Sequence, residues 1–177
     1  MSNIFIKNAK VIATMDDNQT EIVNQSVYCE NGKIIEIGEC KNSNYDKRIT
    51  INASDMVVIP GLVNTHHHLF QNLTRCYPKA QNESLFGWLS SLYPVWNKIG
   101  PSDIYISSLI GLSEMVLSGC TTSSDHLYLF PNGSKLEDQI EAAIDVGCRF
   151  HATRGSMSIG ESKGGLPPDS LTENEDF

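Results

Sequence analysis

From about residue 57 onward, short β-type runs alternate with segments of helical periodicity. The apolar run 56–59 comes first, and helical patterns cover residues 102–118 and 136–146, with β-type runs beginning at Cys120 and Cys148. Strands that alternate with helices in this way are typical of a parallel sheet. The sheet could be Rossmann-like or part of a barrel. No Gly-x-Gly-x-x-Gly follows any of these strands, so a dinucleotide-binding fold has no support.

Start and stop signals flank both expected helices. Ser102 is a candidate N-cap for the first helix, and Gly119 is its expected stop. Ser134 and Glu137 form a possible capping box for the second helix, which Gly147 is expected to end. The apolar stripe predicted for the first helix comprises Ile106, Leu109, Ile110, Val116 and Leu117; that of the second comprises Leu136, Ile140, Ala143 and Ile144.

The first 57 residues have an all-β pattern. Asn31-Gly32 is a strong hairpin signal, and it lies between the β-type runs 26–30 and 33–38. A further strand is predicted over residues 48–53. These strands indicate a small sheet whose apolar face needs a partner.

Three of the five histidines are consecutive, at His66, His67 and His68, and they follow the strand-like run 56–59. In a strand, residues i and i+2 share a face, which would place the Cα atoms of His66 and His68 about 7 Å apart. Two imidazoles at that spacing can converge on one metal ion. A tag remnant, a surface turn and a chance cluster satisfied by local hydrogen bonds remain open alternatives. A metal site needs at least one further protein ligand.

Charge and cysteine usage exclude some classes of function. The net charge of the 177 residues is −8, which argues against nonspecific binding to nucleic acid or an anionic membrane. The five cysteines are scattered, without a Cys-x-x-Cys, so neither a disulfide framework nor a zinc knuckle is expected. We therefore expect a cytoplasmic protein in a reducing compartment. We see no signal peptide, and no apolar run approaches the roughly 20 residues of a membrane span.

Two motifs resemble the amidohydrolase superfamily. Pro-Gly-Leu-Val-Asn-Thr-His-His-His at 60–68 resembles the His-x-His signature of its first barrel strand, and residues 117–122 resemble its Gly-x-Thr-Thr entry to the second strand. The resemblance implies an α/β fold: part of a composite β-sandwich in residues 1–57, followed in residues 58–177 by the N-terminal part of a TIM-like (β/α)8 barrel. Such a barrel takes about 250 residues, so this chain would supply about three of its eight units.

Within the superfamily, the chain is most similar to 8-oxoguanine deaminases and triazine-type aminohydrolases. The similarity is carried by residues 67–71, 124–133, 150–158 and 164–169. It implies a hydrolase of carbon–nitrogen bonds other than peptide bonds, with one divalent metal ion, expected to be zinc. The expected reaction converts 8-oxoguanine to urate and ammonia. The implied partners are a small purine or triazine substrate and, when the enzyme is complete, further copies of itself.

The same resemblance assigns roles to four residues. His66 and His68 match the two first-strand metal ligands. Gln71 matches a position where related deaminases use an amide to hold the purine, and an amide suits this role because it both donates and accepts hydrogen bonds. Arg154, at the end of the predicted third strand, could donate to a purine carbonyl. The alternatives are a solvated loop position for Gln71 and an ion pair for Arg154.

Other candidates are expected to be structural. His126 and His151 sit near the ends of the predicted second and third strands, where barrel active sites gather, but hydrogen-bonded structural roles are favoured over metal ligation. Trp88, Tyr93 and Trp96 could stack on a base, although packing in a core or lid is the favoured interpretation.

The chain departs from the superfamily pattern in what it lacks. The resemblance predicts two further histidines, an aspartate and an acid/base glutamate from later strands, and we expect all of these beyond Phe177. Residues 155–177 are predicted to be loop. We therefore expect an N-terminal fragment that is poorly stable and inactive alone. Alternatives for the complete protein are a guanine or triazine aminohydrolase, a two-metal cyclic amidohydrolase with a modified lysine, and a non-catalytic metal-binding module.

Overall fold

The computed structural model describes residues 3–41 and 48–174, and it divides into the compact units Met1–Pro60 and Gly61–Phe177. The division lies three residues after the boundary expected at residue 57. The strand β5 (Val57–Val58) pairs with β1 in the first sheet. The apolar run 56–59 therefore does not begin the second unit, whose first strand is β6 (Leu62–Asn64).

The first unit is a β-sheet with strand order β3-β2-β1-β4, to which β5 adds along β1. The predicted hairpin is confirmed: β2 and β3 are antiparallel and are joined through Asn31 and Gly32, both with positive φ. A small core forms from Ala9, Ile12, Val27 and Ala53. The strands are β1 (Asn3–Ala13), β2 (Glu21–Glu30), β3 (Lys33–Gly38) and β4 (Arg48–Asn52).

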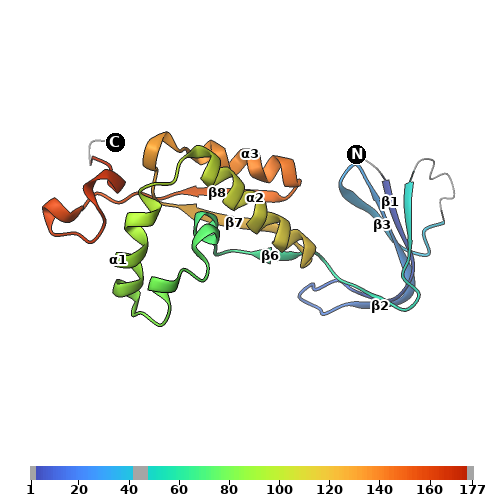
Figure 1. Ribbon diagram of the computed structural model, residues 1–177. Coiled ribbons are helices and arrows are strands. Elements are labelled where there is room, and N and C mark those ends of the chain that lie inside the picture. The colour runs from blue at the N-terminus through green and yellow to red at the C-terminus, as the bar shows by residue number, and fades with distance from the viewer. Residues whose placement is uncertain (1–2, 42–47, 175–177) are drawn as a thin grey trace. The chain divides into compact units, whose positions relative to one another are not determined.

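The second unit is a three-stranded parallel sheet in the order β6-β7-β8, as the alternating pattern predicts. Figure 1 shows α2 and α3 side by side along this sheet, and α3 contacts both α2 and β8. The elements are β6, η1 (Leu69–Thr74), η2 (Pro78–Ala80), α1 (Leu85–Trp96), α2 (Pro101–Leu117), β7 (Cys120–Leu127), η3 (Pro131–Gly133), α3 (Leu136–Val146), β8 (Arg149–Arg154), η4 (Glu161–Lys163) and η5 (Asp169–Leu171).

Both predicted helix starts are shifted. The N-cap of α2 is Gly100 rather than Ser102, since its N–H donates to Asp103 Oδ2 at 2.9 Å. The N-cap of α3 is Lys135, whose N–H donates to Asp138 Oδ2 at 2.7 Å. The predicted capping box from Ser134 to Glu137 is therefore wrong by one residue. In both helices the N3 aspartate accepts the backbone N–H of the N-cap residue, but the N-cap residue itself, Gly100 or Lys135, forms no side-chain cap. The predicted stops, Gly119 and Gly147, are confirmed with φ of 89° and 76°.

The buried face of α2 differs from the predicted apolar stripe. Its buried residues are Ile104, Ser107, Ser108, Gly111 and Leu112, whereas Leu117 is 88% exposed. Small side chains dominate this face because η1 approaches it closely. A Cβ on Gly111 would lie 2.1 Å from Asn72 Nδ2 and 2.7 Å from Leu69 Cδ2. The α3 prediction is confirmed only in part: Ala143 is buried and Leu136 packs against the larger core, whereas Ile144 is 71% exposed and Gln139 is buried instead.

Two core clusters lie in the described part of the second unit, residues 61–174. The larger contains Trp96 and Phe70, with their rings 5.1 Å apart, and the smaller contains Leu69, Leu112 and Ala143. In the larger cluster, Trp88 and Tyr93 each form an edge-to-face contact with Trp96. The packing interpretation is therefore confirmed for Tyr93 and Trp96, which are buried, whereas Trp88 packs against this cluster but is only half-buried.

The segment after β8 is mostly irregular, as predicted. Within its described part, residues 155–174, the only regular elements are the short turns η4 and η5. Residues 175–177 of this predicted loop lie outside the described residues. Across residues 3–41 and 48–174, none of the helices combines the length and apolar character needed to cross a bilayer.

Candidate functional site

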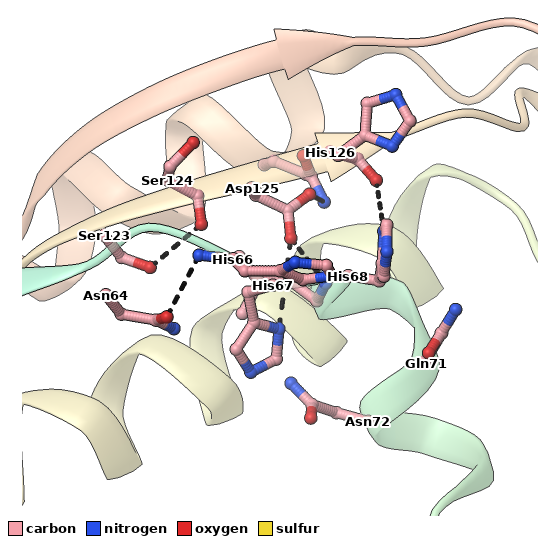
Figure 2. A network of polar contacts seen from close by, with 12 residues as sticks. Asn64, His66, His67, His68, Gln71, Asn72, Ser123, Ser124, Asp125 and His126 are labelled. Atoms are coloured by element: carbon pink, nitrogen blue, oxygen red, sulfur yellow. Dashed lines mark hydrogen bonds and ion pairs between the residues drawn. The ribbon is translucent and has the colours of Figure 1, made fainter.

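The three consecutive histidines lie just beyond a strand rather than in one. Strand β6 ends at Asn64, and η1 begins at Leu69. Asn64 Oδ1 accepts the N–H of His66 at 3.2 Å, an asparagine turn that bends the chain away from the sheet. The expectation that His66 and His68 share a strand face is therefore wrong in its local geometry. Their rings nevertheless lie together, with centroids 5.3 Å apart and planes nearly perpendicular (Figure 2).

This spacing fits two imidazoles that bind one zinc ion. With Zn–N bonds of about 2.0–2.1 Å and tetrahedral angles, the two ring centres would lie about 5 Å apart. The observed 5.3 Å is close to that value. Within residues 3–41 and 48–174, no group of three histidine, cysteine, aspartate or glutamate residues could hold a metal ion. The described residues thus bring two candidate nitrogen donors together, one fewer than the three protein ligands of a catalytic zinc site.

Three hydrogen bonds connect the turn that carries the histidines, residues 65–68 and the following Leu69, to the end of β7. The backbone N–H of His126 donates to the carbonyl oxygen of His67 at 3.0 Å. The ring Nδ1 of His68 lies 2.8 Å from the carbonyl oxygen of His126. The N–H of Leu69 donates to Asp125 Oδ1 at 2.6 Å. Figure 2 shows how this short stretch of β7 lies alongside the turn.

The contact between His68 and His126 fixes the tautomer of the ring. A carbonyl oxygen can only accept, so Nδ1 of His68 must carry the proton. The lone pair of the neutral imidazole then resides on Nε2. Metal-binding histidines commonly use this arrangement, with one ring nitrogen held by a carbonyl and the other free for the ion.

Asp125 is the buried charge beside the turn. It is 1% exposed, and Gln139 Nε2 donates to its Oδ2 at 2.8 Å. Burial raises the pKa of Asp125 to about 6, although the hydrogen bonds from Leu69 and Gln139 act in the opposite direction. Sequence reasoning missed this residue. Strand alternation was the available signal, because it places Asp125 on the same face of β7 as the buried Ser123 and Leu127.

His67 lies on the other side of the turn. Its Nδ1 is 4.0 Å from Asp125 Oδ1, beyond hydrogen-bond range, and it has no hydrogen-bond partner in the described part of the chain. Burial, followed by the neighbouring His68, lowers the pKa of His67. A neutral ring is therefore favoured at this position.

Gln71 lies beside the histidine pair. It lines a cavity of about 330 Å³ together with His66 and His68, and Trp88 lies on the same cavity. Gln71 Nε2 donates to the hydroxyl oxygen of Tyr128 at 3.2 Å, which leaves Oε1 as an acceptor. A second cavity of about 370 Å³ is lined by Thr65, His66, His67, His68, Ser124, Asp125, His126 and Thr153.

Arg154 lies at the end of β8 and lines neither of these two cavities. Its guanidinium forms an ion pair with Glu173 and lies 4.5 Å from the ring centre of Phe130. The alternative of an ion pair, left open by the sequence, is thus present in the structure. This arrangement still leaves the Arg154 side chain about half exposed.

The two remaining histidines differ in their surroundings. The ring of His126 lies against Gly155, where a Cβ would be 2.2 Å from Nε2, and it is 5.6 Å from the ring of Tyr128. His151 is exposed on β8, at the position that pairs with Ser124 of β7. His126 reaches the histidine turn through its two backbone hydrogen bonds, and its ring also lies 5.5 Å from the ring of His68.

Comparison with known proteins supplies the family. Residues 57–176 match the Amidohydrolase family, which is more than half of the chain. The chain belongs to this family. The described fold is accordingly the first part of an amidohydrolase barrel preceded by a β-sheet portion, as the two motifs indicated.

Three relatives illustrate the range of similar amidohydrolases. The chain is 40% identical over 98% of its length to 8-oxoguanine deaminase of Pseudomonas aeruginosa, and 38% identical over 93% to 5′-deoxyadenosine deaminase of Methanosarcina barkeri. Over 96% of its length, the chain also matches the crystal structure of atrazine chlorohydrolase from Arthrobacter aurescens TC1 complexed with zinc, with 30% identity and a TM-score of 0.83. The chain spans 38%, 36% and 39% of these proteins, respectively.

Proposed function

We propose that the complete protein carrying this chain is a metal-dependent hydrolytic deaminase of a purine-like base, with 8-oxoguanine as the substrate. The observation that carries this proposal is the adjacent pair of imidazoles, His66 and His68, whose ring centres lie 5.3 Å apart on a turn at the carboxyl end of a parallel sheet. The similarity to 8-oxoguanine deaminase supports the substrate class. Atrazine chlorohydrolase, solved with zinc, supports a divalent metal.

His66 and His68 would hold one zinc ion through ring nitrogens, and for His68 the free nitrogen is Nε2. When bound, zinc would supply hydroxide at neutral pH by lowering the pKa of its water toward about 7. The balanced reaction is 8-oxoguanine plus water giving urate plus ammonia. We place the remaining ligands and the acid/base glutamate outside the described residues.

Gln71 and Arg154 would bind the substrate. With Nε2 of Gln71 engaged by Tyr128, its Oε1 can accept an N–H of the base beside the metal pair. Arg154 would donate a hydrogen bond to a purine carbonyl. Its guanidinium carries five N–H donors, so it can do this with an N–H that is not engaged by Glu173, or by giving up its ion pair with Glu173. We further propose a homo-oligomer in the cytoplasm, where the five free cysteines would remain reduced.

The test is ammonia release by the purified complete protein. Zinc-loaded enzyme should release ammonia from 8-oxoguanine with a higher kcat/KM than from guanine, 5′-deoxyadenosine or a hydroxylated triazine. His66→Asn and His68→Asn should each abolish this release. Preference for the triazine or the nucleoside would contradict the substrate assignment, and activity retained in both variants would contradict the metal pair.

Metal stoichiometry separates the remaining alternatives. One zinc ion per chain is expected for the deaminase, whereas two ions favour a cyclic amidohydrolase. Zinc binding without hydrolysis of any of these substrates would favour the non-catalytic metal-binding module.

A further inference from the structure

Leu69, the residue that follows the second candidate ligand, is held on both sides of its backbone. Its N–H donates to Asp125 Oδ1, and its carbonyl oxygen accepts the hydroxyl proton of Ser107, each at 2.6 Å. Its side chain is fully buried. Leu69 therefore cannot rotate without breaking two buried hydrogen bonds that come from different elements, β7 and α2.

Asp125 is held in turn by a third element. Gln139 of α3 is fully buried and donates Nε2–H to Asp125 Oδ2 at 2.8 Å. Each carboxylate oxygen thus has one donor. A buried carboxylate is costly unless such donors satisfy it, and a well-packed apolar side chain at this position would avoid that cost.

We propose that Asp125, oriented by Gln139, is a positioning residue that sets the direction of the His68 imidazole for metal binding. This inference rests on the proposed metal site. The N–H of Leu69 belongs to the peptide group that follows His68, so holding that N–H fixes the ψ angle of His68. A fixed backbone at His68 places Nδ1 within 2.8 Å of the His126 carbonyl oxygen and leaves Nε2 for the ion.

Two substitutions separate placement from charge. Asp125→Leu fills a similar volume but removes the acceptor for Leu69 N–H. Asp125→Asn removes the charge yet keeps that acceptor, and its amide can donate to Gln139 Oε1, which has no hydrogen-bond partner among the described residues. We expect Asp125→Leu to lower zinc affinity by about 10- to 100-fold, the usual effect of losing a residue that orients a ligand. Asp125→Asn should stay within about threefold of the parent protein.

The experiment uses the complete protein and two measurements. Competition with a chromophoric chelator gives zinc affinity. Imidazole ¹⁵N shifts of the metal-free protein show whether His68 Nδ1 carries the proton, and Asp125→Leu should lose that signature while Asp125→Asn keeps it. If Asp125→Leu does not fold, Gln139→Leu replaces it, with an expected loss in zinc affinity of about tenfold.

Ile104→Ala is the control for a purely structural role. Ile104 is fully buried on α2, but it belongs to the larger core cluster rather than to the one around Leu69. It should lower the melting temperature without changing the His68 signature or zinc affinity. The proposal is overturned if Ile104→Ala reproduces the losses, if Asp125→Asn matches Asp125→Leu, or if Asp125→Leu and Gln139→Leu change neither quantity. Failure of the proposed function would differ, since the parent protein itself would then not bind zinc through His66 and His68 or not release ammonia.

Discussion

The ring Nδ1 of His68 lies 2.8 Å from the carbonyl oxygen of His126. The end of strand β7 thus orients the imidazole of a candidate metal ligand on the turn that follows the neighbouring strand β6. The parallel pairing of β6 and β7 brings these two residues together from 58 positions apart in the sequence. The imidazole is therefore oriented by backbone within the second unit, before any further ligand is added. Such pre-organisation reduces the entropy that metal binding must overcome.

Close packing of α2 on η1 predicts a specific effect at Gly111. In Gly111→Ala, the added methyl would overlap Asn72 and Leu69, and overpacking of this kind costs about 1–3 kcal/mol. The matched control is Gly87→Ala in α1, where the three atoms nearest to the new Cβ all belong to the flexible side chain of Glu83. Thermal melts of the complete protein should show a lower melting temperature for Gly111→Ala alone. Equal melting temperatures would show that η1 does not constrain this helix face.

Asp125 predicts a component of stability that weakens as the pH rises. Because its folded-state pKa is raised from 3.8 to about 6, the folded protein binds this proton more tightly than the unfolded chain does. The contribution is fully present below about pH 4 and is lost as pH rises through about 6, amounting to about 2–3 kcal/mol. In metal-free protein, the stability of the parent relative to Asp125→Asn should fall across this window. A difference that does not vary with pH would contradict the raised pKa.

The pairing of Gln71 with Tyr128 predicts a substrate-binding effect for Tyr128→Phe. Burial raises the pKa of Tyr128 to about 12, and its hydroxyl oxygen accepts the Nε2–H of Gln71 at 3.2 Å. Loss of one such hydrogen bond is worth about 1 kcal/mol, so KM for 8-oxoguanine should rise about fivefold with little change in kcat. Tyr93→Phe is the control, because the Tyr93 hydroxyl contacts the Met157 sulfur instead. An unchanged KM in Tyr128→Phe would argue against Gln71 as a substrate ligand.

Arg154 can be tested against another arginine of the same strand. Arg154→Met should raise KM for 8-oxoguanine by about tenfold or more, because a hydrogen bond to a charged group is worth about 1.5–3 kcal/mol. Arg149→Met, at the opposite end of β8, should leave KM unchanged. Steady-state kinetics of both variants, with melting temperatures, decide the matter. A drop in stability without a change in KM would assign Arg154 to its ion pair with Glu173 alone.

Local and periodic features of the fold could be predicted from the sequence. The Asn31-Gly32 hairpin, the helix stops at Gly119 and Gly147, and the parallel pairing of β7 with β8 follow from glycine geometry and from the alternation of strands and helices. The apolar stripe of α2 could not be predicted in this way. Its buried face is set by the close approach of η1 at Gly111, a tertiary constraint that favours small residues over large apolar ones.

The candidate site shows the same limit. The sequence indicated His66 and His68 as a pair, and the prediction placed them on one face of an extended strand. In the structure the Asn64 side chain stabilises a turn, and the two rings come together on that turn. Asp125 was not predicted because an acidic residue in a β-type run is usually assigned to the solvent face. Its role depends on two contacts that a local pattern does not reveal. Leu69 is 56 positions away in the sequence, and Gln139 lies on a different element, the helix α3.

The most direct test of the central claim is anomalous diffraction at the zinc edge from crystals of the complete protein grown with zinc. The account predicts a single strong peak about 2.0–2.1 Å from a ring nitrogen of His66 and from Nε2 of His68. A peak bound to neither ring would contradict the metal pair, and two peaks about 3.5–4 Å apart would contradict the one-metal deaminase.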